Sequence, residues 1–226
     1  SVESLVVETG TEPPSQQEAA KLLGLMLNKN PILPEQLGQD TFMKLAELTG
    51  VEELMLAYYK PWSVLTLIAY AEPDGYSPQY GIDFLLMARA RSEGRKMYSL
   101  ENPFDALELF ISLPDDKIIE TIHYYVDNIE TLKAENVELL KHYHANHVSE
   151  VIKVDYSQYA GDDEDFWMDW IYRLQDERNL KWMQELPVIL KKNSALIAVG
   201  ALHLFGDAGL IELLRAEGYT VSPVYR

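Results

Sequence analysis

The fold is decided by residues 196–215, LIAVGALHLFGDAGLIELLR. Residues 196–199 are four apolar residues without alternation, which predicts a strand buried on both faces. The leucines that follow recur at helical spacing, and we expect a helix over residues 206–217 that ends at Gly218. This order of strand, glycine-rich turn and helix is typical of an α/β protein.

His203 lies in the turn, at the carboxyl end of the expected strand. Ligands of open α/β sheets bind at that edge, and the following helix offers free N–H groups to an anion. Gly200 permits close backbone approach or an unusual φ, and Gly206 permits the turn into the helix. A structural histidine with satisfied hydrogen bonds is the alternative interpretation of His203.

Three further strands are expected. Residues 5–8 form an early apolar strand, and residues 80–94 form a helix that leads into a strand at 96–101. Residues 219–222, after Gly218, form the last short strand. The sequence therefore predicts a mixed sheet flanked by helices.

The rest of the chain has helical spacing of its apolar residues. We expect helices at 16–27, 41–48, 62–71, 105–152 with a break at 113–116, 163–174 and 176–190. Because the strands lie toward both ends, we interpret residues 1–226 as a single domain with a large, mainly helical insertion at about 103–192.

Composition excludes several classes of partner. Nineteen basic and 36 acidic residues give a net charge of −17, which repels nucleic acid and anionic membranes. The apolar stretch at 63–70 is far shorter than the roughly 20 residues that span a bilayer, so we expect no transmembrane segment. With no cysteine, a metal would need histidine or carboxylate ligands, and the compartment is left open.

Two clusters have functional and structural interpretations. His142, His144 and His147 are residue types that bind transition metals, but on a helix His142 lies about 200° from His144, which favours a solvated face. The acidic run at 162–165 suits the amino end of a helix and lacks the oxygen spacing and glycine of a calcium loop.

Arg178 and Asn179 bring hydrogen-bond donors into an acidic part of the sequence. Arginine clamps a carboxylate bidentately, whereas a salt bridge to a neighbouring helix is the structural alternative. Glu8 and Glu101 each end an expected strand, so they are either surface residues or members of a site on the same edge as His203.

Several of these motifs together resemble the TraB/PrgY/GumN family, which includes the Tiki proteins. The resemblance is carried, in family order, by residues 5–8, 81–83, 100–101, 177–179, 199–209, 214–215 and 218–221. It implies an α/β fold related to the erythromycin esterases and the haem-binding ChaN-like proteins, and for the Tiki branch a metal-dependent peptidase activity.

The family site is thought to use two Gly-x-x-His motifs and a glutamate. Gly200 to His203 matches the second motif. The first is expected before residues 5–8, where this chain has no residues to supply it, so either an upstream hairpin is missing or this member lacks half the site. His203 and Glu8 make two metal ligands where a catalytic zinc typically takes three, so we expect weak metal binding and no hydrolysis by the chain as given.

The resemblance implies a metal-dependent hydrolase of peptides for the full-length protein, with Mn, Co or Zn. His203 would be a ligand or acid/base, Glu8 a ligand or base, and Arg178 with Asn179 an oxyanion or substrate clamp. Residues expected to bind substrate are Asp83, Glu101, Gly200 and Gly206. The alternative is a non-catalytic protein that sequesters a peptide or small ligand; haem is the weakest option. Many relatives are exported, and the sequence leaves the oligomeric state open.

Overall fold

The structure is a computed structural model that describes residues 2–69, 80–147 and 163–224. It divides into two compact units. Unit 1 comprises Ser1–Pro13, Gln79–Leu109 and Asp155–Arg226, and unit 2 comprises Pro14–Pro78 and Phe110–Val154. Each unit is described by itself.

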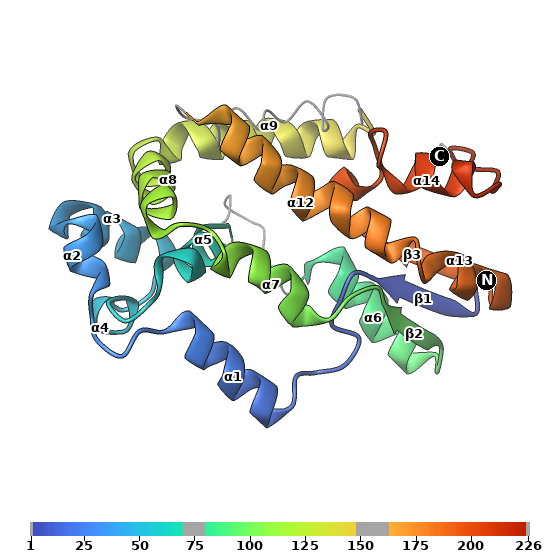
Figure 1. The fold of residues 1–226 in the computed structure, drawn as a ribbon, viewed down its shortest axis with the longest axis horizontal. Helices are drawn as coiled ribbons and strands as arrows, with labels where there is room; N and C mark the ends of the chain where they lie inside the picture. The colour runs from blue at the N-terminus through green and yellow to red at the C-terminus, as the bar shows by residue number, and fades with distance from the viewer. Residues whose placement is uncertain (1, 70–79, 148–162, 225–226) are drawn as a thin grey trace. The chain divides into compact units, whose positions relative to one another are not determined.

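Unit 1 contains a three-stranded parallel sheet (Figure 1). Its strands are β1 (Ser4–Val7), β2 (Lys96–Ser99) and β3 (Ala195–Ala198), in the order β2-β1-β3. Leu5 of β1 pairs with Met97 of β2 and with Leu196 of β3. Parallel strands need crossover connections, and the helices between them supply these. The predicted α/β class is confirmed.

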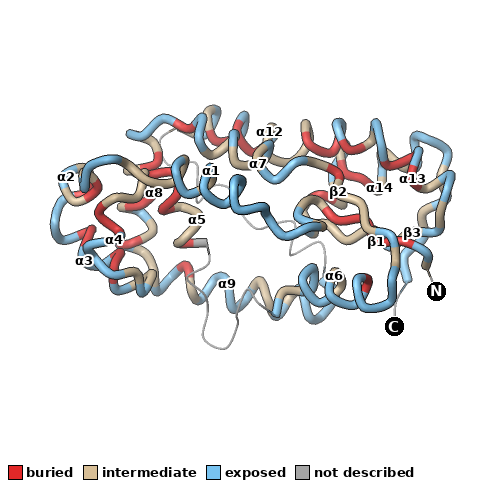
Figure 2. Tube along the Cα trace, turned by 90° about the horizontal axis from the view of Figure 1, so that it is seen from below, coloured by how far each residue is buried: buried red, intermediate tan, exposed pale blue. Residues whose placement is uncertain are grey.

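The strand buried on both faces is β1 and not, as the sequence indicated, the strand at 196–199. Every residue of β1 is buried (Figure 2). The prediction for β3 is wrong because β3 is an edge strand, where Leu196 keeps 41% of its surface exposed. The strand expected at 219–222 is also wrong: these described residues form none, and the described sheet has only parallel strands.

Helices cover both faces of the sheet. On one face, Leu5 and Val7 pack with Ala90 of α6 (Ile82–Ser92). On the other, Val6 packs with Trp182 of α12 (Glu164–Trp182), with α13 (Leu186–Lys192) and with α14 (Leu210–Ala216). Alternate residues of β1 thus pack into the hydrophobic cores on the two faces of the sheet, because successive side chains of a strand point to opposite faces.

The helix α12 is continuous, so the predicted break between 174 and 176 is wrong. No glycine or proline interrupts residues 170–180, and leucine, glutamine and arginine are good helix formers. Because α12 continues, Arg178 and Asn179 lie inside a helix that packs on the sheet. The helix α14 starts at Leu210 and not at 206, because a turn through Gly206 (φ +86°) precedes it.

Unit 2 is helical among its described residues. Its helices are α1 (Gln16–Met26), α2 (Leu33–Leu37), α3 (Gln39–Thr49), α4 (Glu53–Leu56), α5 (Pro61–Ala69), α8 (Asp115–Asp127) and α9 (Ile129–His144); α7 (Pro103–Ile111) crosses the boundary between the units. Ser15 caps α1 in a capping box with Glu18. The predicted insertion at 103–192 coincides with neither unit, because α12 and α13 pack with the sheet.

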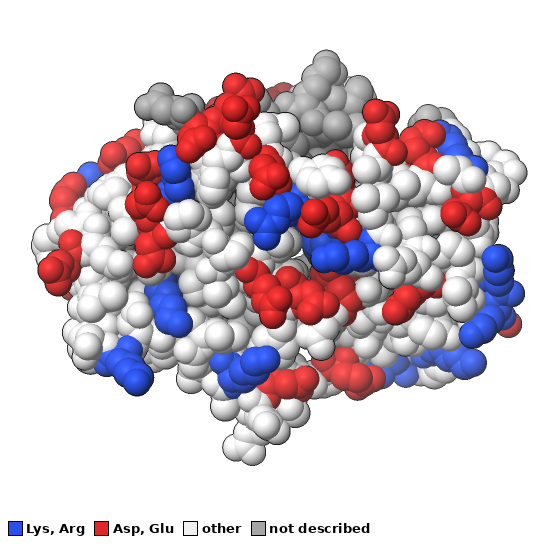
Figure 3. Space-filling model, in the orientation of Figure 1, with Lys and Arg blue, Asp and Glu red and all other residues white. Residues whose placement is uncertain are grey.

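The surface reflects the composition. Acidic side chains are spread over the face seen in Figure 3, with basic ones between them. Among the described helices, none is long and apolar enough to cross a bilayer.

Candidate functional site at the carboxyl edge of the sheet

Polar side chains converge where the three strands end. Glu8 directly follows β1, Glu101 lies two residues after β2, and His203 closes a 3₁₀ turn (Ala201–His203) after β3. Because the strands are parallel and in register, their carboxyl ends meet at one edge. The structure therefore brings together these three residues that the sequence analysis selected from distant segments.

Arg178 lies at the centre of this cluster. Its Nε donates to Glu101 Oε2 (3.0 Å), and Nη2 donates to Glu101 Oε1 (2.6 Å) and to Glu8 Oε2 (2.8 Å). Its Nη1 donates to the carbonyl of Leu174 (3.0 Å) and to His203 Nε2 (3.1 Å). A guanidinium has five N–H donors, so every donor of Arg178 is used within the protein.

Hydrogen bonds and neighbouring negative charges hold Arg178 in its ionised form. Its side chain is 10% exposed and that of Glu101 is 8% exposed. Burial opposes the charge, but the hydrogen bonds and charges of Glu101 and Glu8 outweigh it and raise the pKa of Arg178. Glu8, at 26%, is the most exposed member of this group.

His203 is a neutral histidine with a defined tautomer. Its Nε2 accepts from Arg178, so Nδ1 carries the proton and donates to Asn179 Oδ1 at 2.8 Å. Burial lowers the pKa of His203 to about 4, an effect that Glu8 opposes and Arg178 assists. Both ring nitrogens are therefore occupied, and the side chain is 7% exposed.

Asn179 connects His203 to the turn that follows it. Its Nδ2 donates to the carbonyl oxygens of His203 (3.1 Å) and Ala208 (2.9 Å), and the residue is fully buried. All of its donors are used, as are those of Arg178. As arranged, neither residue has a side-chain donor free for the clamp on substrate that the sequence analysis predicted.

Trp182 is a member of this cluster that the sequence analysis missed. Its Nε1 donates to Glu101 Oε2 (3.2 Å), and its ring lies 4.4 Å from the His203 ring and 4.9 Å from Arg178 Cζ. Trp182 is four residues after Arg178, which places the two on the same face of a helix. That spacing was the available signal, because both residues lie within the helix expected at 176–190. It does not indicate which side chains at the sheet edge the indole contacts.

The glycines of the turn have different roles. Gly200 has an ordinary φ of −54°, and its N–H donates to Glu8 Oε1 at 2.7 Å. A Cβ at this position would lie 3.3 Å from that same oxygen. Gly200 therefore permits the close approach of the backbone to Glu8 and is not required for an unusual φ. Gly206 has φ +86°, as the predicted turn requires, and a Cβ on Gly209 would overlap with the Phe205 carbonyl.

Asp83 approaches the same edge from α6. It lies in the first turn of that helix, is largely exposed and has a raised pKa, because of partial burial and the charge of Glu8. It makes no hydrogen bond or ion pair among the described residues. It is thus near Glu8 but outside the Arg178 cluster.

A divalent metal of the kind the family resemblance implies does not fit these residues as arranged. The two predicted ligand atoms, His203 Nε2 and Glu8 Oε2, are 3.9 Å apart, and each accepts an N–H of Arg178. No group of three or more histidine, cysteine, aspartate or glutamate residues in the described segments could hold an ion.

The other candidate clusters form no metal site in the part of the chain that the structure describes. His142 lies beside His147, with ring centroids 5.8 Å apart, whereas His144 faces Tyr143. The helix α9 ends at His144, and Asn146, at φ +57°, turns the chain back after it, so His147 lies outside the helix. Of the acidic run, Asp162 lies outside the described residues, while Asp163 to Asp165 begin α12, as the helix-dipole interpretation expects.

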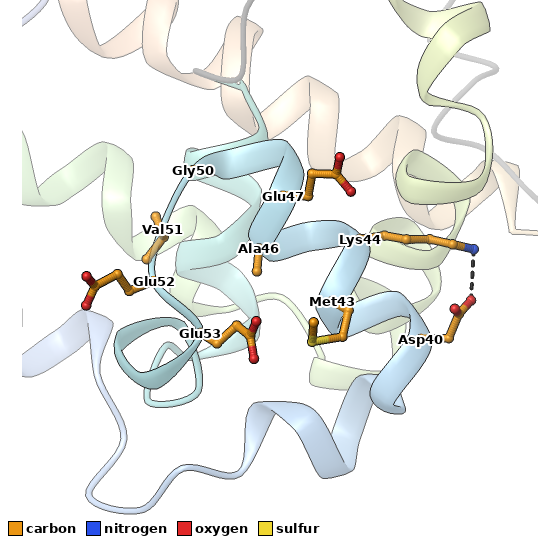
Figure 4. Close-up of a pocket in the computed structure, with 9 residues that line it drawn as sticks. All are labelled: Asp40, Met43, Lys44, Ala46, Glu47, Gly50, Val51, Glu52 and Glu53. Atoms are coloured by element: carbon orange, nitrogen blue, oxygen red, sulfur yellow. Dashed lines mark ion pairs between the residues drawn. The ribbon is translucent and has the colours of Figure 1, made fainter.

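Unit 2 carries an open hollow of about 460 Å³ between α3 and α4. Figure 4 shows the carboxylates of Glu47, Glu52 and Glu53 pointing in different directions, and Lys44 pairs with Asp40 at 2.8 Å. No candidate residue of the sequence analysis lines it. The candidate site therefore remains the carboxyl edge of the sheet in unit 1.

Comparison with known proteins finds a family and two relatives of this chain. The pattern of the TraB/PrgY/gumN family matches residues 1–223. The uncharacterized protein YbaP of Escherichia coli (strain K12) is 22% identical over 191 residues, which are 81% of this chain and 68% of YbaP, and YbaP of Shigella flexneri matches equally. No solved structure matches. Since the family pattern extends over nearly the whole sequence, the chain belongs to the TraB/PrgY/gumN family.

Proposed function

We propose that the chain is a hydrolase that cleaves peptides, with Glu8 as the group that activates water. This proposal replaces the expectation of no hydrolysis, which assumed that a metal activates the water. The observation that carries this proposal is the state of Glu8, which is held at the sheet edge by Gly200 N–H and Arg178 yet remains 26% exposed. Each carboxylate oxygen has a second lone pair available for a water molecule. The choice of a peptide rests on the resemblance to the Tiki proteins.

Asp83 is the second group proposed to take part. Partial burial and the charge of Glu8 raise the pKa of Asp83, which favours a proton on this carboxyl. Glu8 would accept a proton from water as the water oxygen attacks the peptide carbonyl carbon. Asp83 would then protonate the amine as the C–N bond breaks.

Arg178, Asn179, Trp182 and His203 are positioning residues in this proposal. Their hydrogen bonds are directed at one another and at Glu8 and Glu101. They orient Glu8 without touching substrate, and no step is assigned to a metal, because the described residues do not fit one as arranged.

The test is cleavage of a mixed peptide library by wild type, Glu8→Gln and Glu3→Gln, each with EDTA and with Mn²⁺. Glu3 is the matched control, because it lies at the opposite end of β1, where it accepts from Ser194 N. Loss of a general base lowers the rate by about 100-fold or more, so only Glu8→Gln should lose cleavage. Equal cleavage by all three proteins would contradict the proposal.

A second candidate function is the sequestering of a peptide or small ligand without cleavage. The observation that favours it is that both ring nitrogens of His203 and all donors of Arg178 are already occupied, which leaves neither free to act as base or clamp. If wild type retains peptides intact in every condition and Glu8→Gln releases them, this function replaces the first.

A further inference from the structure

Three side chains at the carboxyl edge share a single partner. Glu8 Oε2, Glu101 Oε1 and His203 Nε2 each accept an N–H of the Arg178 guanidinium, at 2.8, 2.6 and 3.1 Å. Two carboxylate oxygens and one neutral imidazole nitrogen are also a set of donors that zinc, manganese or cobalt takes. The guanidinium thus lies where these three donor atoms point.

We propose that Arg178 is the resident cation of this site. While the guanidinium is present, Glu8, Glu101 and His203 bind no divalent metal; once it is removed, the three side chains form a metal site. The inference concerns binding and does not depend on the proposed hydrolysis.

Charge explains why the two cations exclude each other. Arg178 and Glu101 are almost fully buried, so a divalent ion beside the guanidinium would repel it in a medium that screens charge poorly. The ion would also have to replace the hydrogen bonds of Arg178 with Glu8 and His203. The guanidinium of Arg178 balances part of the charge of the two carboxylates. A divalent ion would need the same acceptor atoms, which the guanidinium already occupies.

The three side chains keep other partners when Arg178 is absent. Glu8 Oε1 accepts from Gly200 N, Glu101 Oε2 accepts from Trp182 Nε1, and His203 Nδ1 donates to Asn179. Such second contacts hold metal ligands in orientation, and a histidine that donates through Nδ1 has Nε2 free for a metal. The remaining movement is small, because metal ligands lie about 2.0–2.2 Å from the ion and these atoms lie 2.6–3.1 Å from the guanidinium nitrogens.

Two substitutions of Arg178 separate the loss of the guanidinium from the loss of its charge. Arg178→Ala leaves room for an ion with its water, whereas Arg178→Lys keeps a cation. Arg215→Met is a surface control, because it removes an exposed arginine paired with Glu212. Each protein is titrated with Co²⁺, whose visible absorption reports protein ligands directly, and its melting temperature is measured with and without Co²⁺.

The expected result is that Arg178→Ala binds one Co²⁺ at least tenfold more tightly than wild type and recovers melting temperature on binding. Wild type, Arg178→Lys and Arg215→Met should show neither effect, and adding Glu101→Gln to Arg178→Ala should abolish the gain. One Co²⁺ bound tightly by wild type and lost in Glu8→Gln would overturn the proposal. An Arg178→Ala protein that folds without binding Co²⁺, or that Co²⁺ fails to restore to the folded state, would overturn it as well.

Discussion

The two ends of the parallel sheet contain the same residue types in different arrangements. At the amino end, Glu3 accepts from Ser194 N, and Arg95 pairs with Glu93 two residues away, all near solvent. At the carboxyl end, Arg178 joins Glu8, Glu101 and His203, which are 170, 77 and 25 residues distant. The amino end therefore contains ordinary surface pairs, whereas the carboxyl end contains one buried network.

Burial and the number of shared partners distinguish a candidate site from ordinary surface ion pairs. Exposed ion pairs contribute little, because water and salt screen them. A buried arginine that uses all five donors fixes the position of every group it contacts. Substitutions should therefore have large effects at the carboxyl end and small ones elsewhere.

The largest difference in the free energy of unfolding is expected between the variants Arg178→Met and Arg215→Met. Removing Arg178 leaves Glu101 buried with an unbalanced charge, which should lower the free energy of unfolding by about 3–5 kcal/mol. Removing Arg215 breaks an exposed pair and should cost about 0–1 kcal/mol. Urea unfolding of both variants measures the difference, and equal midpoints would show that the network does not stabilise the fold.

The next effect is expected for Asn179→Ala. It leaves His203 Nδ1 and two carbonyl oxygens without their partner, at a cost of roughly 1–3 kcal/mol in unfolding free energy. Asn193→Ala is the matched control at the amino end of β3, where Asn193 donates one hydrogen bond to the Tyr98 hydroxyl. In thermal unfolding, the melting temperature of Asn179→Ala should be well below that of Asn193→Ala. The reverse order would show that the hydrogen bonds of Asn179 do not stabilise the fold.

A pH effect follows from the lowered pKa of His203. An unfolded histidine binds a proton below a pKa near 6.5, but the folded His203 does so only below about 4. Its contribution to stability is therefore complete above pH 6.5 and is lost as the pH falls from 6.5 to 4, by at most about 1.4 kcal/mol per pH unit.

Comparison of wild type with His203→Asn isolates this contribution. The difference in unfolding free energy between them should shrink as the pH falls through this range. His144→Asn, which changes an exposed histidine of unit 2, should leave the pH profile unchanged. A profile of His203→Asn parallel to that of wild type would mean that the pKa of His203 does not change on folding.

The smallest change in the free energy of unfolding is expected for substitutions of two glycines of one turn. Gly206→Ala forces an alanine to φ +86° and should cost about 1 kcal/mol or more of unfolding free energy. Gly200→Ala keeps an allowed φ of −54° but brings its Cβ within 3.3 Å of Glu8 Oε1. It should change stability by less than Gly206→Ala while reducing peptide cleavage, and unchanged cleavage would show that the position of Glu8 tolerates movement.

The sequence predicted the members of the network better than their connections. Strand ends located Glu8, Glu101 and His203, because parallel strands finish at a common edge. Arg178 and Asn179 were selected as donors in an acidic region, but nothing in the sequence states which oxygen each donor meets. Their full internal pairing, which argues against a clamp on substrate, depends on packing of α12 against the sheet.

Other predictions failed for reasons that lie in tertiary structure. The four apolar residues at 196–199 resemble a central strand, yet only the strand order makes β1 central and β3 an edge. Trp182 was missed because its spacing from Arg178 predicts a shared helix face but not the contacts of its indole with Glu101 and His203. The positive φ of Asn146 precedes His147, whose ring lies beside that of His142, and this turn has no signal in the histidine spacing.

The most direct test of the central claim is a double-mutant cycle on Arg178 and Glu101. Urea unfolding of Arg178→Met, Glu101→Gln and the double variant gives the coupling energy between the two side chains. We expect a coupling above about 1 kcal/mol, with a value near zero for the exposed pair of Arg215 and Glu212. Additive effects of the Arg178 and Glu101 substitutions would contradict the claim that Arg178 is the cation on which this site is built.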